Sequence, residues 1–252
     1  MLKTRIIPCL LLKDLGLVKT VKFSDPKYVG DPINVIKIFN EKEVDELIFL
    51  DITATIENRR PSFGIISKIA SECFMPFSYG GGIRSLDDIK KILEIGVEKV
   101  SINSYAVENP EFIKEASQHF GSQSIIVAVD VKKNLLGGYE VFTSSGKKAT
   151  KIDPVEYVRR MERMGAGEIL LTSIDRDGTQ DGYDLELIER VSRAVNIPVI
   201  CCGGAGKFED FRAAIKAGAS AVSAGSIFVF IGPHRAVLIS YPYPEDMKKI
   251  LY

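Results

Sequence analysis

Apolar residues in this chain gather into two alternating kinds of segment, short continuous runs and longer amphipathic stretches. The short runs are apolar at most positions instead of at every second one, which is typical of parallel strands buried on both faces. The predicted strands cover residues 5–12, 46–51, 77–79, 99–102, 124–129, 168–172, 199–202 and 221–224. We therefore expect a mainly parallel sheet that is covered on both sides.

Seven amphipathic stretches lie between these runs and predict helices. They cover residues 32–40, 63–73, 86–95, 110–120, 154–164, 185–195 and 208–217. Glycine follows several of them closely, which favours helix termination, at Gly96, Gly121, Gly165 and Gly218. A capping residue followed by proline marks three helix starts, at Asp31-Pro32, Asn109-Pro110 and Asp153-Pro154.

Strands and helices alternate along the chain, which is the pattern of an α/β protein. The length of 252 residues fits two domains or one (β/α)8 barrel, so length alone does not decide between them. Eight strands joined by right-handed crossovers favour the closed barrel. We predict one TIM barrel domain over residues 1–252, with an open doubly wound sheet as the alternative.

A glycine-rich stretch occurs twice, at residues 76–88 and again at 198–210. The offset of 122 residues between the two copies continues without a gap through the segments that follow them. We therefore predict that the barrel consists of two duplicated half-barrels, about 1–122 and 123–252. An open sheet has no reason to repeat such a turn at a fixed offset, so the repeat supports the barrel.

Each copy places glycines directly after a predicted strand and before a predicted helix. Such glycines let the backbone approach a ligand closely, and the free N–H groups of a helix start suit a phosphate. A second turn of small residues follows in each copy. The residues concerned are Gly82, Asn103 and Ser104 in the first copy and Gly204, Gly225 and Ser226 in the second. We expect two phosphate sites related by a pseudo-twofold axis; alternatively, the glycines only tighten strand–helix turns.

The C-terminal ends of the strands form the active face of a barrel of this kind. Asp130, at the end of the fifth predicted strand, is the best-placed carboxylate for proton transfer, and burial would raise its pKa toward neutrality. Its alternative role is to cap the next turn. The segment 13–30 is expected to be a long loop carrying Lys19, either a lid over an anionic ligand or a solvated basic loop.

Charged residues also occur at the starts of four predicted strands, at the opposite end of the barrel. They are Arg5, Glu46, Lys99 and Glu168. If they point inward, the two cations and two anions form a closed ring of ion pairs across the barrel floor. This ring is either a plug that satisfies buried charges or a polar gate into the barrel axis; buried pairs are not reliably stabilising.

Composition and charge exclude several classes of partner. The 33 basic and 33 acidic residues cancel, so we expect no nucleic acid and no anionic membrane as a partner. No run approaches the roughly 18 apolar residues of a membrane span, and the N-terminus lacks the apolar run of a signal peptide, so we expect a cytoplasmic protein. Two histidines, and four cysteines without metal-type spacing, predict no metal site. We predict no cofactor.

Several longer motifs closely resemble the cyclase subunit family of imidazole glycerol phosphate synthase. The motifs lie at residues 6–9, 45–54, 80–83, 99–103, 120–123 and 165–179, and the similarity runs from about residue 3 to about residue 230. The resemblance implies a (β/α)8 barrel duplicated from half-barrels, which binds a small substrate with two phosphates at opposite rims. It also implies a glutaminase subunit on the barrel floor and ammonia passing through the charged ring to the active site.

The resemblance assigns roles by motif. It implies one phosphate site at Gly82, Asn103 and Ser104, and another at Asp177, Gly178, Gly204, Gly225 and Ser226. It implies the ammonia gate at Arg5, Glu46, Lys99 and Glu168.

Two features depart from this family. The first predicted strand of the family ends in a catalytic aspartate, whereas this chain has Leu11, and nothing in the sequence argues that Asp51 or Asp175 substitutes for it. The segment 228–242 also replaces the usual last strand-to-helix segment. Both features resemble a paralogue group linked to surface-polysaccharide genes. That resemblance implies ammonia supply for converting an acetamido sugar to its acetamidino form, together with a glutaminase and an ATP-using amidotransferase.

Three hypotheses therefore stay open. The first is an ammonia-conducting barrel subunit of the paralogue type, which we favour. The second is a working cyclase of histidine biosynthesis, in which Asp130 acts with a substitute acid. The third is a non-catalytic scaffold or activator of the glutaminase, whose phosphate sites are vestigial.

Overall fold

The computed structural model describes residues 4–134 and 137–242, and within them eight parallel strands close into a barrel. In the order in which they pair, the strands are β1 (Arg5–Lys13), β4 (Leu47–Asp51), β5 (Phe77–Gly80), β6 (Lys99–Ile102), β7 (Ile125–Lys133), β10 (Glu168–Ser173), β11 (Val199–Cys202) and β12 (Ala221–Ala224). Parallel pairing of β12 with β1 closes the circle. The predicted TIM barrel is therefore confirmed, and the open sheet is excluded.

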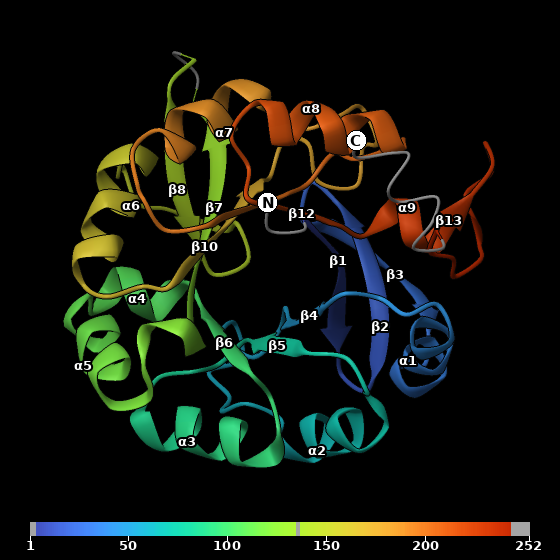
Figure 1. Ribbon diagram of the computed structural model, residues 1–252, viewed down its shortest axis with the longest axis horizontal. Helices are drawn as coiled ribbons and strands as arrows, with labels where there is room; N and C mark the ends of the chain where they lie inside the picture. Colours follow the sequence, from blue (N-terminus) through green and yellow to red (C-terminus); the bar gives the residue numbers. More distant parts are fainter. Residues whose placement is uncertain (1–3, 135–136, 243–252) are drawn as a thin grey trace.

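Helices form a ring around the barrel (Figure 1). The seven predicted ones are α1 (Pro32–Glu41), α2 (Phe63–Glu72), α3 (Leu86–Ile95), α5 (Glu111–Phe120), α6 (Pro154–Arg163), α7 (Leu185–Ser192) and α8 (Phe208–Lys216). Three short helices were not predicted, namely α4 (Ser104–Glu108), the 3₁₀ helix η1 (Ser122–Ser124) and α9 (Ser226–Val229). These short helices have too few residues to show a periodic apolar face, which is why the sequence pattern missed them.

Local chemistry explains most helix ends. The Asp31 and Asp153 side chains accept hydrogen bonds from the first free N–H groups of α1 and α6, each just before a proline. Gly96 ends α3 in the left-handed conformation, at φ +113°. The predicted cap at Asn109 is wrong, because this residue ends α4 and α5 begins after Pro110.

The barrel interior and the helix–barrel interface form two separate apolar clusters. Successive strand residues point to opposite faces, so alternate positions of each strand fill the interior. The interior cluster consists of Ile7, Cys9, Ile48, Ile126, Ala128, Leu170, Ile200, Cys202 and Ala221. The barrel interior is therefore a packed core. All four cysteines are free thiols; Cys9, Cys201 and Cys202 are buried, and Cys73 is half-buried.

The segment 13–30 is an antiparallel hairpin, not the loop predicted from the sequence. Its strands β2 (Gly16–Val21) and β3 (Ser24–Gly30) pair with each other, and β2 also pairs with the end of β1. Neither strand shows a clear alternation of buried and exposed positions, so the hydrophobic pattern of the sequence did not reveal the hairpin.

A second hairpin extends the corresponding strand of the other half. The strand β8 (Tyr139–Thr143) pairs antiparallel with β7, and β9 (Lys148–Ala149) pairs antiparallel with β8. Both halves therefore begin with a barrel strand followed by an antiparallel hairpin, which agrees with a duplicated half-barrel. Near the C-terminal end, β13 (Phe230–Ile231) and β14 (Ala236–Val237) form a small separate sheet.

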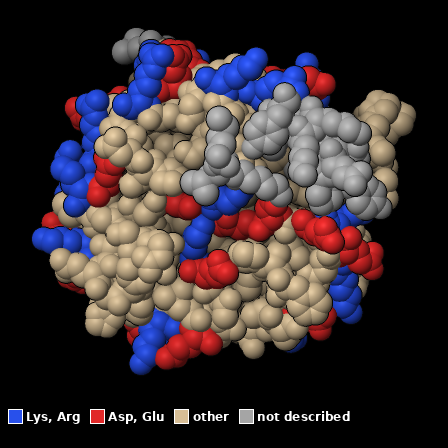
Figure 2. All heavy atoms as spheres, in the orientation of Figure 1, with Lys and Arg blue, Asp and Glu red and all other residues tan. Residues whose placement is uncertain are grey.

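The surface carries no dominant charge on the face that is in view. Figure 2 shows basic and acidic side chains interspersed around this face and close together near its middle. Among the described residues, none of the helices is long and apolar enough to span a membrane.

Candidate active site

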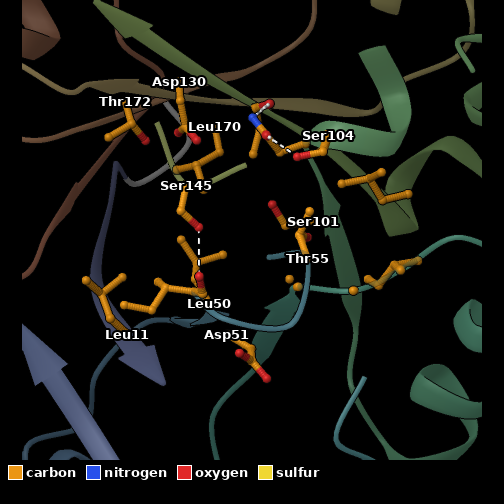
Figure 3. A pocket seen from close by; sticks show the side chains of 18 of the residues that line it. Leu11, Leu50, Asp51, Thr55, Ser101, Ser104, Asp130, Ser145, Leu170 and Thr172 are labelled. Atoms are coloured by element: carbon orange, nitrogen blue, oxygen red, sulfur yellow. Dashed lines mark hydrogen bonds between the residues drawn. The ribbon is translucent and has the colours of Figure 1, made fainter. Parts of the chain in front are cut away.

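A cavity opens at the C-terminal ends of the barrel strands, which is the face predicted to be active (Figure 3). The space in and in front of it, open solvent included, is about 1010 Å³. Residues of both halves line it, among them Leu11, Leu50, Asp51, Gly82, Asn103, Ser104, Asp130, Ser145, Leu170, Thr172 and Asp177. The fold therefore brings five of the predicted site residues to one opening, namely Gly82, Asn103, Ser104, Asp130 and Asp177.

Asp130 lies in the C-terminal half of β7 and lines this cavity next to Thr172 (Figure 3). Burial and the nearby Asp177 carboxylate raise the pKa of Asp130 to about 7, while a hydrogen bond with Thr172 acts in the opposite direction. A carboxyl group with this pKa exchanges protons readily at neutral pH. The predicted proton-transfer residue therefore has a suitable environment.

Leucines occupy the corresponding level of the cavity wall in the first half of the barrel. Leu11 pairs with Leu50 in the register of β1 and β4, whereas Asp130 pairs with Thr172 in the register of β7 and β10. Both pairs line the cavity, so equivalent positions of the two halves are apolar in one case and polar in the other. The first strand thus contributes no acid at this level.

The two carboxylates considered as substitutes for Leu11 have structural partners. Asp51 accepts hydrogen bonds from the backbone N–H groups of Thr53 and Ala54, both at 3.0 Å, and forms an ion pair with Arg59 at 3.2 Å. Asp175 accepts a hydrogen bond from the Lys133 N–H at 2.9 Å. Neither residue is therefore placed as a free acid beside Asp130.

The first predicted phosphate site is assembled at the cavity wall. Gly82 has φ +72°, and a Cβ there would lie 2.5 Å from the Arg59 carbonyl oxygen, so the turn itself requires glycine. Asn103 donates to the Ala128 carbonyl at 3.0 Å, and the Ser104 hydroxyl donates to Asn103 Oδ1 at 3.1 Å. The structural role of Gly82 is therefore shown, and phosphate binding by this group stays a prediction.

The second predicted phosphate site lies beside the β2–β3 hairpin. Gly204 has φ +116°, and a Cβ there would overlap the Gly182 carbonyl group. A Cβ at Gly178 would likewise overlap the Thr20 backbone. Ser226 is buried at the first position of α9. Of this set, only Asp177 lines the cavity, so the two predicted sites are not equally open.

Lys19 is buried, with 7% of its surface exposed. Its ammonium group donates a hydrogen bond to the Cys9 carbonyl oxygen at 2.6 Å and lies against Gly225. A solvated basic loop is therefore wrong for this residue, because the hairpin packs the side chain into the barrel mouth. Its role as a lid stays a prediction.

The turn of the second hairpin crosses the mouth of the cavity, and this crossing segment, the strap, was not predicted from the sequence. Ser145, in the turn between β8 and β9, donates to the Ile52 carbonyl at 2.7 Å, and the Ser144 N–H donates to the Ser104 hydroxyl at 3.0 Å. These bonds join the two halves above the pocket. The Ser-Ser-Gly sequence from Ser144 to Gly146 is a turn signal that could have located the hairpin.

The barrel floor carries the predicted ring of charges. Arg5 contacts Glu46 at 2.6 Å and Glu168 at 2.9 Å. Lys99 contacts the same two carboxylates at 3.4 Å and 3.2 Å. Each anion therefore bridges both cations, and the ring of ion pairs is closed.

Above the ring, the interior contains two polar groups among its apolar side chains. The buried hydroxyl groups of Ser78 and Ser101 have no hydrogen-bond partner within residues 4–134 and 137–242. Ser101 lines the cavity, and Ser78 alternates with the cavity residue Gly80 along β5, so both face the barrel axis. A small polar molecule inside the barrel would find hydrogen-bonding groups here.

Comparison with known proteins decides the family. The family described as "Histidine biosynthesis protein" matches residues 5–232 of this chain. The chain belongs to this family.

Individual relatives fall into two sets by how much of the chain they match. A Pseudomonas aeruginosa protein, provisionally named imidazole glycerol phosphate synthase subunit hisF2, is 54% identical over 251 residues and covers 99% of both chains. A Leptospira interrogans protein, also provisionally named as such a subunit, is 49% identical and covers 100% of both. Imidazole glycerol phosphate synthase subunit HisF of Hydrogenobaculum sp. is 50% identical over 231 residues, covering 91% of this chain and 92% of its own.

The family found by comparison is therefore consistent with the family that the sequence motifs resemble.

Within the described part of the chain, no group of three or more metal-ligating side chains gathers in one place.

Proposed function

We propose that this protein is the synthase-type barrel subunit of a glutamine amidotransferase complex, which receives ammonia from a glutaminase docked on the barrel floor. The observation that carries the proposal is the closed ring of ion pairs at the floor. Above it lie two serine hydroxyls without a hydrogen-bond partner among the described residues, and the Asp130 carboxylate lies at the far end. This arrangement suits a small polar molecule that enters at one end of the barrel and reacts at the other.

The acceptor of the ammonia is proposed to be a phosphorylated small molecule at the cavity. We further propose that ammonia serves acetamidino-sugar formation in the synthesis of surface polysaccharide such as the lipopolysaccharide O-antigen, with a third, ATP-using amidotransferase. One observation supports this reading over the histidine pathway: Leu11 leaves the first strand without an acid at the cavity.

The second candidate is the cyclase of histidine biosynthesis. The names of the Hydrogenobaculum and Sulfolobus acidocaldarius relatives favour it, the latter being 50% identical over 225 residues. In this case Asp130→Asn should abolish turnover. A third candidate, a non-catalytic activator of the glutaminase, predicts no heat of binding with bisphosphate ligands in calorimetry.

Turnover driven by free ammonium separates the first two candidates. The purified barrel, without a partner, is given the bisphosphate substrate of the histidine pathway and excess ammonium, which bypasses the floor. We expect no imidazole glycerol phosphate from the unchanged protein and partial recovery in Leu11→Asp, because a second carboxylate then faces Asp130 across the cavity. Leu50→Asp, on the neighbouring strand, is the matched control and should recover none.

Product formation by the unchanged barrel at an enzymatic rate would show that Leu11 is tolerated and that the histidine cyclase is the correct function.

The floor is tested separately, by measuring whether the barrel stimulates glutamine hydrolysis by the glutaminase. No stimulation would remove the amidotransferase proposal itself.

A further inference from the structure

The small β13–β14 sheet belongs to the segment that departs from the family pattern. It follows α9 at the edge of the barrel (Figure 1), and the Leu238 N–H at its end donates to the Val229 carbonyl at 2.9 Å. The family match ends at residue 232, inside the turn that joins the two strands. What the rest of this turn contributes is therefore not given by the family.

The turn carries Arg235, whose side chain reaches the second predicted phosphate site. Its Nη2 group donates a hydrogen bond to the Gly178 carbonyl oxygen. Gly178 lies in the turn after β10, and the preceding residue, Asp177, lines the cavity. One arginine therefore connects the C-terminal sheet with a turn at the barrel mouth.

Arg235 is held in this position at a cost in free energy. Its backbone lies in the left-handed region, at φ +51°, which is unfavourable for a residue with a side chain. Its Nε atom is buried and has no hydrogen-bond partner within residues 4–134 and 137–242. The guanidinium group lies 5.1 Å from the centre of the Phe230 ring, which restricts its movement. Strain and an unsatisfied donor at one residue point to a function.

A second cation reaches the same predicted site from the β2–β3 hairpin. The Lys19 ammonium lies so close to Gly225 that a Cβ there would be 1.8 Å from it. Lys19 and Arg235 both donate to backbone carbonyl oxygens, and neither forms an ion pair with a carboxylate of the described residues. The predicted site contains one carboxyl group, that of Asp177. Two cations and one carboxyl group leave a positive charge, which attracts an anion.

We propose that Arg235 binds a phosphate group of the substrate at the second site. The inference deepens the proposed function, because it names a residue that holds the phosphorylated acceptor, and it rests on that function. The ligand class is a phosphate monoester. A guanidinium group is planar and permanently charged, and its several N–H donors suit the oxygens of a phosphate. The hydrogen bond to Gly178 uses one of these donors and leaves others for the ligand.

The test is a titration of the purified barrel with inorganic phosphate, followed by proton–nitrogen correlation NMR. The backbone N–H signals of Gly178 and Gly82 report on the two predicted sites separately. Arg235→Met removes the charge and should weaken phosphate binding at Gly178 about tenfold or more, while the Gly82 response stays unchanged. Arg235→Lys keeps the charge without the planar group and should weaken binding less.

Arg193→Met is the matched control, because this guanidinium pairs with Glu189 at 2.6 Å at the exposed end of α7. It should change neither response. Near-ultraviolet circular dichroism checks that Arg235→Met keeps its packing. If that variant does not fold, the Arg235 Nε–H signal of the unchanged protein replaces it. This signal is assigned by its absence in Arg235→Lys and should shift with the same midpoint as Gly178.

Equal phosphate affinity at Gly178 in the unchanged protein and in Arg235→Met would overturn the inference. A Gly178 signal that does not respond to phosphate at all would overturn it too. A loss of equal size at Gly178 and Gly82 would mean that the variant disturbs the whole barrel, and a specific role of Arg235 would then be rejected.

The outcome can be told apart from that of the proposed function, because the titration needs no glutaminase. Phosphate binding that depends on Arg235, in a barrel that stimulates no glutaminase, would keep this site and remove the proposed function. Stimulation of the glutaminase by a barrel whose phosphate response ignores Arg235 would do the reverse.

Discussion

At the scale of single residues, the proton chemistry of the active face depends on the surroundings of one carboxylate, Asp130. Asp130 has Leu170 and the Thr172 hydroxyl near it, and the Asp177 carboxylate acts on its pKa (Figure 3). Burial and the neighbouring charge both favour the protonated form, so the folded protein holds this proton more tightly than an unfolded chain does. The residue is therefore useful for proton transfer and costs stability at neutral pH.

This cost predicts a pH-dependent effect of Asp130→Asn. The pKa of Asp130 is about 7 in the folded protein and near 3.8 when unperturbed. Its contribution to stability therefore falls as the pH rises from about 4 through 7. The stability of Asp130→Asn relative to the unchanged protein should be about 2 kcal/mol more favourable at pH 8 than at pH 5, measured by urea unfolding.

Asp175→Asn is the control for this experiment and should show the same relative stability at both pH values. An equal effect of Asp130→Asn at pH 5 and pH 8 would mean that Asp130 titrates like an exposed carboxyl group.

At the scale of elements, the starts of four barrel strands build the floor and the ends build the cavity. The ring works as a unit because each carboxylate contacts both cations. Loss of one cation leaves two partly buried anions with a single partner, Arg5. Removing one cation from an isolated ion pair at the surface costs little stability, because water solvates the remaining anion.

Lys99→Ala should therefore destabilise the fold by about 1–3 kcal/mol and disturb passage through the floor. Within the proposed complex, Lys99→Ala should lower the rate of the synthase reaction driven by glutamine about tenfold more than the rate driven by free ammonium. The reason is that free ammonium bypasses the ring. The two rates are compared in the same preparation with its glutaminase.

The matched control is Lys90→Ala, whose ammonium lies 3.8 Å from Glu94 on the exposed face of α3. It should change stability by less than about 0.5 kcal/mol and leave both rates unchanged. Equal losses of both rates in Lys99→Ala would assign the ring a purely structural role.

At the scale of the whole molecule, two similar halves share one barrel. The halves meet at two seams, the parallel pair of β6 with β7 and that of β12 with β1. Each half alone would expose both strand edges and half of the interior, which favours aggregation. Together they bury these surfaces, and the strap at Ser145 adds a contact across the mouth.

Fragments 1–122 and 123–252 should therefore be poorly soluble when expressed separately and form a soluble one-to-one complex when expressed together. Size-exclusion chromatography with light scattering measures the complex. Fragments cut at Gly165, inside the second half, are the control and should yield less complex. Soluble monomeric halves would contradict the idea that each depends on the other's edges.

Much of this fold follows from the order of the residues alone. Continuous apolar runs, helix caps and glycine stops locate all eight barrel strands and seven of the helices, because these signals are local. The hairpins at 13–30 and after β7 were missed, since their strands carry a weak pattern and are stabilised by pairing with the ends of β1 and β7. The small helices α4 and α9 were missed because they are too short to be periodic.

The site shows the same division between local and distant information. The repeat and the strand ends located Asp130 and the charged ring from sequence, because barrel geometry dictates where strand starts and ends meet. Burial of Lys19 and the hydrogen bond between Thr20 and Asp177 depend on how a hairpin packs against a turn more than 150 residues away. No sequence pattern encodes such a contact, so only the tertiary structure decided these partners and the pKa values that follow from them.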